Sequence, residues 1–424
     1  MAGYEDINGA LHVDGVPLSK IAKECGTPTY VYSASVIKAQ YDALKGAMER
    51  ALPKNRQPLL CYACKANSNV AILSYLRSLG GALEIVSEGE MMRGLKAGFD
   101  PKTIVSTGVG KQDSEIARGL RAGILQFNVE SLPELENINK VAGEVGIKAP
   151  VAFRLNPNVA GGGHKKISTG QKFNKFGIVD DMIDRAFALA SSLPHVEPVG
   201  LSMHIGSQVS TVESFRAAFE KIPDVVGRLR AQGHTISRLD IGGGFPIIYK
   251  DEKLLDLDAY AKWVADFIEP LGTQIIMEPG RYLVGNSGAL LTRTIYVKET
   301  PSRNFLIVDA AMNDLIRPTL YEAYHGIEPV ENRDAAQTTY DVVGPICETG
   351  DTFAVDRPIP AMKAGDLAVI REAGAYGFCM ASNYNTRGLP AEVLVKDGQY
   401  TIIRQRQDVE SIIAQDIVPS WLAA

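Results

Sequence analysis

Short apolar runs alternate with longer segments of mixed apolar and polar residues through the first two thirds of the chain. Eight runs have the length and composition of buried β-strands: residues 59–65, 82–86, 103–108, 124–129, 151–156, 199–206, 238–244 and 274–280. Helical patterns lie between them, for example over residues 74–80, 88–98 and 215–233. Eight parallel strands with crossover helices in roughly 250 residues are typical of a closed (β/α)8 TIM barrel.

The pattern changes after about residue 285. Six runs between Pro, Gly and Asp turns have strand character without long helices between them: residues 290–299, 304–310, 338–344, 366–372, 391–398 and 400–407. We therefore predict an α/β plus β fold. A TIM barrel would cover residues 28–284, and an antiparallel β-sandwich or β-barrel domain would be formed by residues 1–27 and 285–424.

Reactive side chains and glycines gather where the eight predicted strands end. The active site of a TIM barrel lies at this end, on the loops that follow the strands. The sequence therefore predicts chemistry on one rim, from the strand-end residues Lys65, Ser87, Thr107, Gly108, 128–130, 154–156, 204–207, 242–244 and 278–281.

Composition and charge narrow the classes of function. The chain has 424 residues, of which 46% are hydrophobic and 22% charged, and its 44 basic and 49 acidic side chains give a net charge of -5. This balance argues against a nucleic-acid surface. No apolar run reaches the roughly 18 residues of a membrane span, and the N-terminus lacks the pattern of a signal peptide. With five sparse cysteines, the sequence predicts a cytoplasmic protein.

Cys61 and Cys64 have the spacing of a metal or dithiol motif. A structural zinc site needs four ligands, and the other three cysteines are isolated from each other. A dithiol redox motif normally begins a helix, whereas residues 59–65 have the pattern of a buried strand. We therefore predict that both thiols fill core space and that no metal is bound.

Lys65 and the glycines 242–244 are the first candidates for chemistry. An unpaired ammonium at the end of an apolar strand has a lowered pKa, and a neutral amine there can form a Schiff base with an aldehyde. Alternatively, the lysine stem packs while its head reaches water or a carboxylate. The glycines allow the backbone to approach a phosphate with its N–H groups, or they form only a tight turn.

Two further motifs add charged and aromatic groups to the same rim. Arg281 suits a phosphate or carboxylate because its guanidinium is a planar fork. Glu278 suits a protonated ring nitrogen, although an ion pair with Arg154 or Arg281 is the ordinary alternative. His204 and Ser207 add an imidazole and a hydroxyl, and His204 alone would more often be structural.

These groups are the ones that pyridoxal phosphate requires on a barrel. The motifs YACKAN (62–67), HIGSQ (204–208), GGG (242–244) and EPGR (278–281) resemble those of the fold-type III pyridoxal-phosphate decarboxylases, which combine a barrel with a C-terminal β domain. A finer resemblance to the diaminopimelate decarboxylase family runs over nearly the whole chain, through residues 26–33, 106–111, 127–131, 166–170, 174–178, 278–288, 308–325, 342–354 and 374–385.

The resemblance implies a role for each matching residue. Lys65 would bind the cofactor as a Schiff base, His204 would stack on its ring, and Glu278 would pair with the ring nitrogen. The remaining cofactor-binding residues would be Ser207, Gly242, Gly243, Gly244, Pro279, Gly280, Arg281 and Tyr376.

The resemblance also implies a substrate site shared between two subunits of a homodimer. Arg317 and Tyr321 would hold a substrate carboxylate, and Arg281 and Tyr376 would also touch the substrate. Cys347 and Glu348 would reach into the partner subunit's site, the thiol as proton donor and the carboxylate toward the amino group at the substrate's D-centre.

The implied reaction is the decarboxylation of meso-2,6-diaminopimelate at its D-centre to L-lysine and carbon dioxide, the last step of lysine biosynthesis. The alternatives are a relative acting on ornithine, arginine or carboxynorspermidine, an amino-acid racemase on the same scaffold, and a homologue without catalysis. Arg317 with Tyr321, and Cys347 with Glu348, argue against the first. The presence of Lys65 and Cys347 argues against the last.

Two segments depart from the family pattern. Family members usually have Ser-Gly-Gly-Glu after the second strand, where this chain has Ser87-Glu88-Gly89-Glu90. Residues 158–166 carry a glycine run (161–163) that the family pattern does not include, and it would form a lid or a loose loop.

Overall fold

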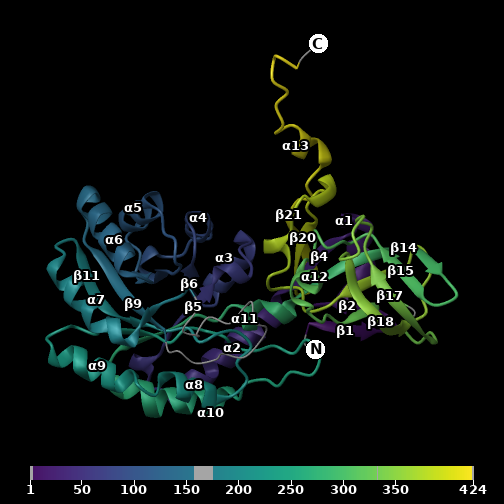
Figure 1. Ribbon diagram of the computed structural model, residues 1–424. Coiled ribbons are helices and arrows are strands. Elements are labelled where there is room, and N and C mark those ends of the chain that lie inside the picture. The colour runs from purple at the N-terminus through teal and green to yellow at the C-terminus, as the bar shows by residue number, and fades with distance from the viewer. Residues whose placement is uncertain (1–2, 157–174, 332, 423–424) are drawn as a thin grey trace. The chain divides into compact units, whose positions relative to one another are not determined.

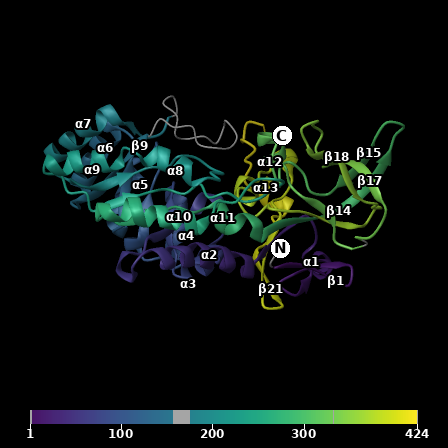
Figure 2. The same cartoon turned by 90° about the horizontal axis from the view of Figure 1, so that it is seen from below.

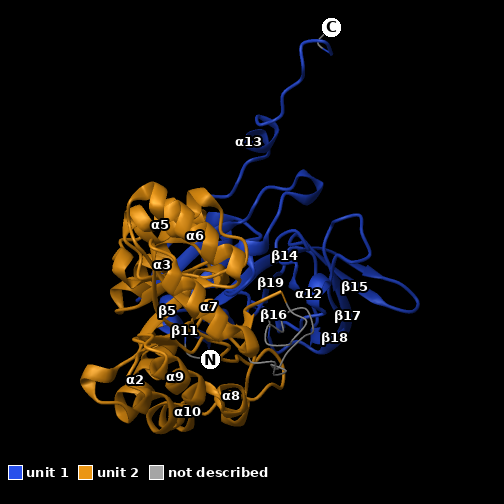
Figure 3. Ribbon diagram, turned by 60° about the vertical axis from the view of Figure 1, so that its left-hand side comes forward, with its two compact units in different colours: residues 1–37, 284–424 blue, residues 38–283 orange. Residues whose placement is uncertain are grey.

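The chain folds into two compact units, which the computed structural model describes over residues 3–156, 175–331 and 333–422. Unit 1 contains residues 1–37 and 284–424, and unit 2 contains residues 38–283 (Figure 3). Residues 28–37, which the sequence analysis assigned to the barrel, therefore lie in unit 1.

Unit 2 is the predicted TIM barrel. All eight predicted strands are present and parallel, and the ring closes between β8 and β9 and between β13 and β5. A short ninth strand, β10 (Ile178–Val179), pairs with β9 outside the ring. The eight barrel strands are β5 (Leu59–Ala63), β6 (Ala82–Ile85), β7 (Ile104–Ser106), β8 (Gln126–Val129), β9 (Ala149–Asn156), β11 (Val196–Ser202), β12 (Arg238–Asp240) and β13 (Gln274–Met277).

The barrel strands are nearly continuous apolar runs because they are buried on both faces. Inside the ring, Cys61, Ala82, Val105 and Ile276 pack together from four neighbouring strands. Helices flank the strands (Figures 1 and 2): α3 (Val70–Ser78), α4 (Glu88–Lys96), α5 (Asp113–Ala122), α6 (Leu132–Val145), α7 (Asp180–Ser192), α8 (Val212–Phe219), α9 (Ile222–Ala231) and α10 (Leu257–Trp263), with α2 (Ala34–Ala51) leading into the unit.

The single helix predicted over residues 215–233 is wrong, because two helices, α8 and α9, occupy this region. Pro223 lies in the first turn of α9, where its missing N–H costs nothing, but inside a continuous helix it would remove a hydrogen bond. Polar side chains cap several other helices at the strand-to-helix junctions. Asn69, Ser87, Ser131 and Asp256 each accept a backbone N–H of the first turn.

Unit 1 contains a nine-stranded sheet in which most strand pairs are antiparallel, as predicted, but the sheet is mixed because two pairs are parallel. β15 pairs in parallel with β17, and β4 from the N-terminal region pairs in parallel with β20. The sequence pattern shows strands but not their partners, and these pairings join distant segments. The strands are β4 (Thr29–Ser33), β14 (Gly288–Glu299), β15 (Asn304–Val308), β16 (Ile327–Pro329), β17 (Gln337–Val343), β18 (Thr352–Pro360), β19 (Leu367–Ile370), β20 (Ala391–Lys396) and β21 (Gln399–Arg404).

β18 was not predicted, since its run contains Pro358 and Pro360. It lies at an edge of the sheet, where proline is tolerated because a missing N–H leaves no ladder bond unmade. Unit 1 also contains β1 (Tyr4–Ile7), β2 (Ala10–Val13), β3 (Val16–Pro17), α1 (Leu18–Cys25), α12 (Arg317–Tyr321) and α13 (Val409–Ile413). The short helix α11 (Arg281–Val284) begins in unit 2 and ends at the first residue of the second segment of unit 1. Within the described ranges, no helix combines the length and apolar character needed to cross a membrane.

Candidate active site

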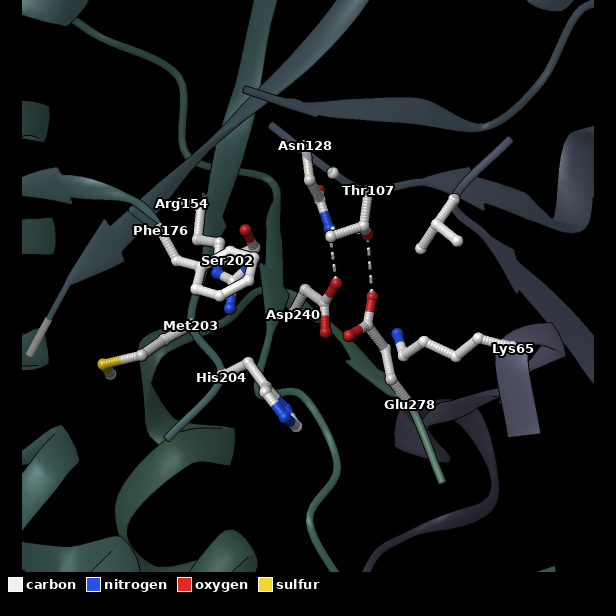
Figure 4. A pocket seen from close by; sticks show the side chains of 12 residues that line it. Lys65, Thr107, Asn128, Arg154, Phe176, Ser202, Met203, His204, Asp240 and Glu278 are labelled. Carbon is white, nitrogen blue, oxygen red and sulfur yellow. Dashed lines mark hydrogen bonds between the residues drawn. The ribbon is translucent and has the colours of Figure 1, made fainter. Parts of the chain in front are cut away.

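A cavity of about 170 Å³ opens at the C-terminal ends of the barrel strands. This is the rim on which the sequence placed the chemistry. Three residues with predicted cofactor roles, Lys65, His204 and Glu278, line it together (Figure 4). The other lining residues are Val86, Thr107, Gly108, Asn128, Arg154, Phe176, Ser202, Met203 and Asp240.

Lys65 enters the cavity from a 3₁₀ turn (Cys64–Ala66) directly after β5, rather than from the strand itself. Its Nζ lies 2.8 Å from Oε2 of Glu84, which is fully buried on β6. Of the two alternatives that the sequence left open for Lys65, the structure shows the one in which the ammonium reaches a carboxylate, which the neighbouring strand supplies. Figure 4 shows the ammonium pointing toward the carboxylate of Glu278 as well.

Cys61 and Cys64 are both buried beside this lysine. Burial raises the pKa of each thiol well above its usual range, which disfavours the thiolate needed for metal binding or disulfide chemistry. Cys61 packs in the barrel interior, as the core reading predicted. Among the described residues, no three His, Cys, Asp or Glu side chains are grouped closely enough to hold a metal ion.

Glu278 and Asp240 form a buried pair of carboxyl groups. Burial raises the pKa of both, with the nearby charges of Asp240 and Glu84 raising that of Glu278 further. Thr107 Oγ1 donates to Glu278 Oε1 at 3.3 Å, and Asn128 Nδ2 donates to Asp240 Oδ2 at 2.9 Å. Two buried carboxyls in contact cannot both ionise, so the pair holds a proton at neutral pH.

Neither alternative partner predicted for Glu278 is the one observed. Arg154 Nη1 lies 2.7 Å from Glu130 Oε1, with both side chains buried. Arg281 Nη1 donates to Tyr249 Oη at 2.6 Å, and its Nε and Nη2 each lie 3.4 Å from Ser207 Oγ. Arg281 and Ser207 are thus brought together, as expected for two groups predicted to hold one phosphate.

His204 is held as a neutral imidazole. Burial, together with the positive charges of Arg154 and Lys65, lowers its pKa well below the usual range. The Gly243 N–H donates to His204 Nδ1 at 3.3 Å. The proton of the neutral ring therefore lies on Nε2.

The glycines 242–244 are needed for close packing. Gly242 and Gly244 have φ of 68° and 97°, a region that other residues adopt at a cost. A Cβ atom on Gly243 would lie 2.1 Å from the Glu278 carbonyl oxygen. The N–H groups of Gly242 and Gly243 donate to Asp240 and His204, so the loop orients those two side chains.

Four of the predicted site residues of unit 1 lie on two connected segments. Arg317 and Tyr321 lie on α12, and Cys347 and Glu348 lie on the loop 344–351. Thr319 Oγ1 of α12 donates to the Gly350 carbonyl oxygen at 2.6 Å, which ties the two segments together. Arg317 is buried, whereas Cys347 is exposed.

Further contacts shape this part of unit 1. Tyr384 Oη donates to Glu348 Oε2 at 2.8 Å. Asp351 closes the loop 344–351 by accepting the N–H groups of Ile346 and Met312 at 2.7 and 2.6 Å. Tyr376 is half-buried with φ of 56°.

The sequence analysis missed several residues of the site. Glu84 and Asp240 are acids within apolar strand segments, and a buried charge in such a run was the signal that could have identified them. Tyr249 lies in a loop, and Tyr384 begins a short 3₁₀ helix (Tyr384–Thr386). No local signal identifies them, because their partners are distant in the sequence.

Ser87-Glu88-Gly89-Glu90 retains a capping arrangement despite its departure from the family pattern. Ser87 Oγ accepts the Glu90 N–H at 3.2 Å, and Glu90 Oε2 accepts the Val86 N–H at 2.7 Å. Glu88 forms an ion pair with Arg118. The glycine run 161–163 and the motif at residues 166–170 lie outside the described residues.

Comparisons with known proteins identify the class first. Residues 37–285 match the family model described as pyridoxal-dependent decarboxylase, pyridoxal binding domain. This match covers the barrel with the lysine, imidazole and paired carboxyls of the cavity. The site and fold are thus those of a pyridoxal-phosphate-dependent decarboxylase.

Full-length relatives identify the family. The diaminopimelate decarboxylase of Pseudomonas aeruginosa is 48% identical over 95% of this chain and 96% of its own length, and that of Vibrio cholerae is 43% identical over 97% of both. The M. jannaschii diaminopimelate decarboxylase structure with L-lysine superposes with a TM-score of 0.93 at 37% identity, covering 100% of this chain and 99% of the other. The Helicobacter pylori structure with L-lysine gives 0.89 at 39% identity, covering 94% and 98%. The chain belongs to the diaminopimelate decarboxylase family.

Proposed function

We propose that this protein decarboxylates meso-2,6-diaminopimelate at its D-centre and releases L-lysine and carbon dioxide. The observation that carries the proposal is the convergence of Lys65, His204 and Glu278 on one cavity in a chain that belongs to this family. The bound L-lysine in two related structures supports the assignment of the product.

The residues of the cavity fit pyridoxal phosphate. Lys65 offers an amine to its aldehyde, and the buried carboxyls of Glu278 and Asp240 offer a charge to its ring nitrogen. The neutral imidazole of His204 offers a flat face. Arg281 and Ser207 lie together as a cation and a hydroxyl for the phosphate.

When bound, pyridoxal phosphate takes up the electrons that remain when the Cα–carboxylate bond breaks. The chain's own residues control that step. Lys65 would hold the cofactor through its side-chain amine, which lines the cavity. An ionised Glu278 would stabilise positive charge on the ring nitrogen of the cofactor, and Asp240 would then carry the proton of the carboxyl pair.

In this proposal, residues of unit 1 select the substrate and donate the proton that replaces carbon dioxide. Arg317 and Tyr321 bind the distal carboxylate of the substrate, which the product L-lysine retains. Glu348 binds the distal ammonium, which lies on the same carbon as the distal carboxylate. The Cys347 thiol gives its proton to the α-carbon after carbon dioxide leaves, and a thiolate remains.

A substrate with a distal ammonium and a distal carboxylate on one carbon fits this combination of charges. Ornithine and arginine lack that carboxylate, so they would leave the buried Arg317 without its counter-charge. Racemisation would require a second base on the opposite face of the cofactor ring.

An absorbance titration tests the function. We expect purified protein with pyridoxal phosphate to have a visible band that shifts when meso-diaminopimelate is added, while L-lysine and carbon dioxide accumulate. A band without L-lysine would reject the substrate and keep the cofactor. A protein that binds no cofactor would reject the whole proposal.

We further propose a cytoplasmic homodimer in which Cys347 and Glu348 complete the partner's site. The exposure of Cys347 supports this. Mixing two inactive variants, Lys65→Ala and Cys347→Ala, should restore about a quarter of wild-type activity, since half the dimers are mixed and each has one intact site. Purification through two different affinity tags, one on each variant, verifies that the dimers are mixed. If these mixed dimers were inactive, the proposal that the two subunits share their sites would be contradicted.

A further inference from the structure

His325 connects Arg317 to the sheet of unit 1. It follows α12 in the chain and is fully buried. Arg317 Nε donates to His325 Nε2 at 3.3 Å. On the other side of the imidazole, Nδ1 lies 2.7 Å from the Arg371 carbonyl oxygen.

These two contacts determine the protonation of His325. A guanidinium nitrogen can only donate, so Nε2 must be the acceptor. A carbonyl oxygen can only accept, so Nδ1 must carry the proton. The neutral Nδ1–H tautomer is the form that satisfies both contacts, and an imidazolium would place two donors against each other beside a second cation.

The ring is anchored to rigid backbone. The Arg371 N–H donates to the Gly326 carbonyl oxygen at 2.8 Å, which extends the pairing of β16 with β19. Arg357 Nη1 donates to the His325 carbonyl oxygen at 2.7 Å, and its guanidinium lies 4.0 Å over the Tyr324 ring. The position of Nε2 is therefore set by the sheet.

We propose that His325 is a positioning residue that orients the Arg317 guanidinium toward the carboxylate of the substrate. This inference rests on the proposed function. Because His325 occupies Nε, the edge formed by Nε and Nη2 cannot bind a carboxylate with two hydrogen bonds. The carboxylate must meet the edge formed by Nη1 and Nη2, so His325 selects the direction from which it is bound.

Two substitutions separate the contacts of His325. In His325→Asn, the amide N–H can replace Nδ1–H at the Arg371 carbonyl, but nothing reaches Arg317. In His325→Gln, the longer amide can replace Nε2 as the acceptor for Arg317. The measured quantities are calorimetric dissociation constants of the pyridoxal-phosphate-loaded variants for L-lysine, which has the carboxylate, and for cadaverine, which lacks it.

We expect His325→Asn to weaken L-lysine binding about tenfold, the loss of one hydrogen bond that orients a charged group. Cadaverine binding should stay within about twofold. His325→Gln should recover most of the L-lysine affinity. Two results would overturn the inference. If His325→Asn weakened L-lysine and cadaverine binding equally, the cause would be general damage to the fold. If it left L-lysine binding unchanged, the contact with Arg317 would not matter for the carboxylate.

Arg317→Met separates this inference from the proposed function. If it weakens L-lysine binding and His325→Asn does not, the role of His325 is wrong and that of Arg317 stands. If Arg317→Met leaves L-lysine binding unchanged, the carboxylate role of Arg317 is wrong and both fall. If His325→Asn does not fold, the imidazole ¹⁵N spectrum of the wild-type holoenzyme tests the inference instead. The His325 signals are assigned by their absence in His325→Gln. An Nε2–H tautomer of His325 would overturn the inference.

Discussion

Nζ of Lys65 lies 2.8 Å from Oε2 of Glu84, although the two residues are 19 positions apart on successive segments of the barrel. Glu84 is fully buried, and its Oε1 has no hydrogen-bond partner among the described residues. The ammonium therefore compensates a charge that the barrel could not otherwise hold.

Replacing Lys65 by Ala should destabilise the cofactor-free protein by about 1–3 kcal/mol, because it leaves the Glu84 carboxylate buried without a partner. This is less than for a fully buried ion pair, since the Lys65 side chain is 38% exposed. Adding Glu84→Gln to that variant should restore most of the loss. Urea denaturation of the wild type, the single variants and the double variant measures the coupling. Additive effects of the two substitutions would contradict it.

Glu278→Gln should lower kcat by about 100-fold or more, because a neutral amide cannot stabilise a protonated ring nitrogen. Cofactor binding should survive, since Lys65 and Arg281 remain. The absorbance spectrum checks that the cofactor is bound, and steady-state kinetics measure kcat. Glu136→Gln, at an exposed position on α6, is the control for the same side-chain change.

The stability of the protein should fall as pH rises from 4.5 to about 7, through the titration of Glu90. Burial, with the nearby charge of Glu84, raises the pKa of Glu90 from 4.5 to about 7 against the lowering effects of the Val86 N–H, Lys65 and Arg93. Between these values the folded state binds the proton more strongly than the unfolded state, so folding is favoured at low pH.

The change attributable to Glu90 should amount to about 2–3 kcal/mol between pH 4.5 and 8. Glu90→Gln should remove it and make the protein more stable than the wild type at pH 8. Denaturation midpoints at several pH values, with the exposed Glu136→Gln as control, measure the difference. A wild-type-like pH profile in Glu90→Gln would refute the assignment.

Gly243→Ala should destabilise the protein by about 3 kcal/mol, because the added Cβ would lie 2.1 Å from the Glu278 carbonyl oxygen. Gly227→Ala is the matched control. Gly227 lies in helix α9 with open space around it, and alanine there should stabilise by about 0.5–1 kcal/mol. Thermal unfolding of both variants measures the difference between their stabilities. If Gly243→Ala were no less stable than Gly227→Ala, the loop 242–244 would be able to shift and make room for the Cβ atom.

Much of the fold was predictable because buried segments have a recognisable local pattern of apolar residues. The eight barrel strands were found from apolar runs, since strands buried on both faces need apolar side chains throughout. The pairing of strands has no such local pattern. The parallel partners β4 and β20 are separated by most of the chain, and nothing in either segment indicates the other. The break between α8 and α9 did have a signal, Pro223, but the surrounding apolar periodicity outweighed it.

The sequence by itself determined the barrel, the strand-end rim and the chemical groups on it, because each depends on residue type and local spacing. Only the tertiary structure decided which of those groups meet. The ion pair of Lys65 with Glu84, the proton shared by Asp240 and Glu278, and the contact of His325 with Arg317 arise from chain closure and sheet pairing. Their strength depends on distance and burial, which no single segment of the chain specifies.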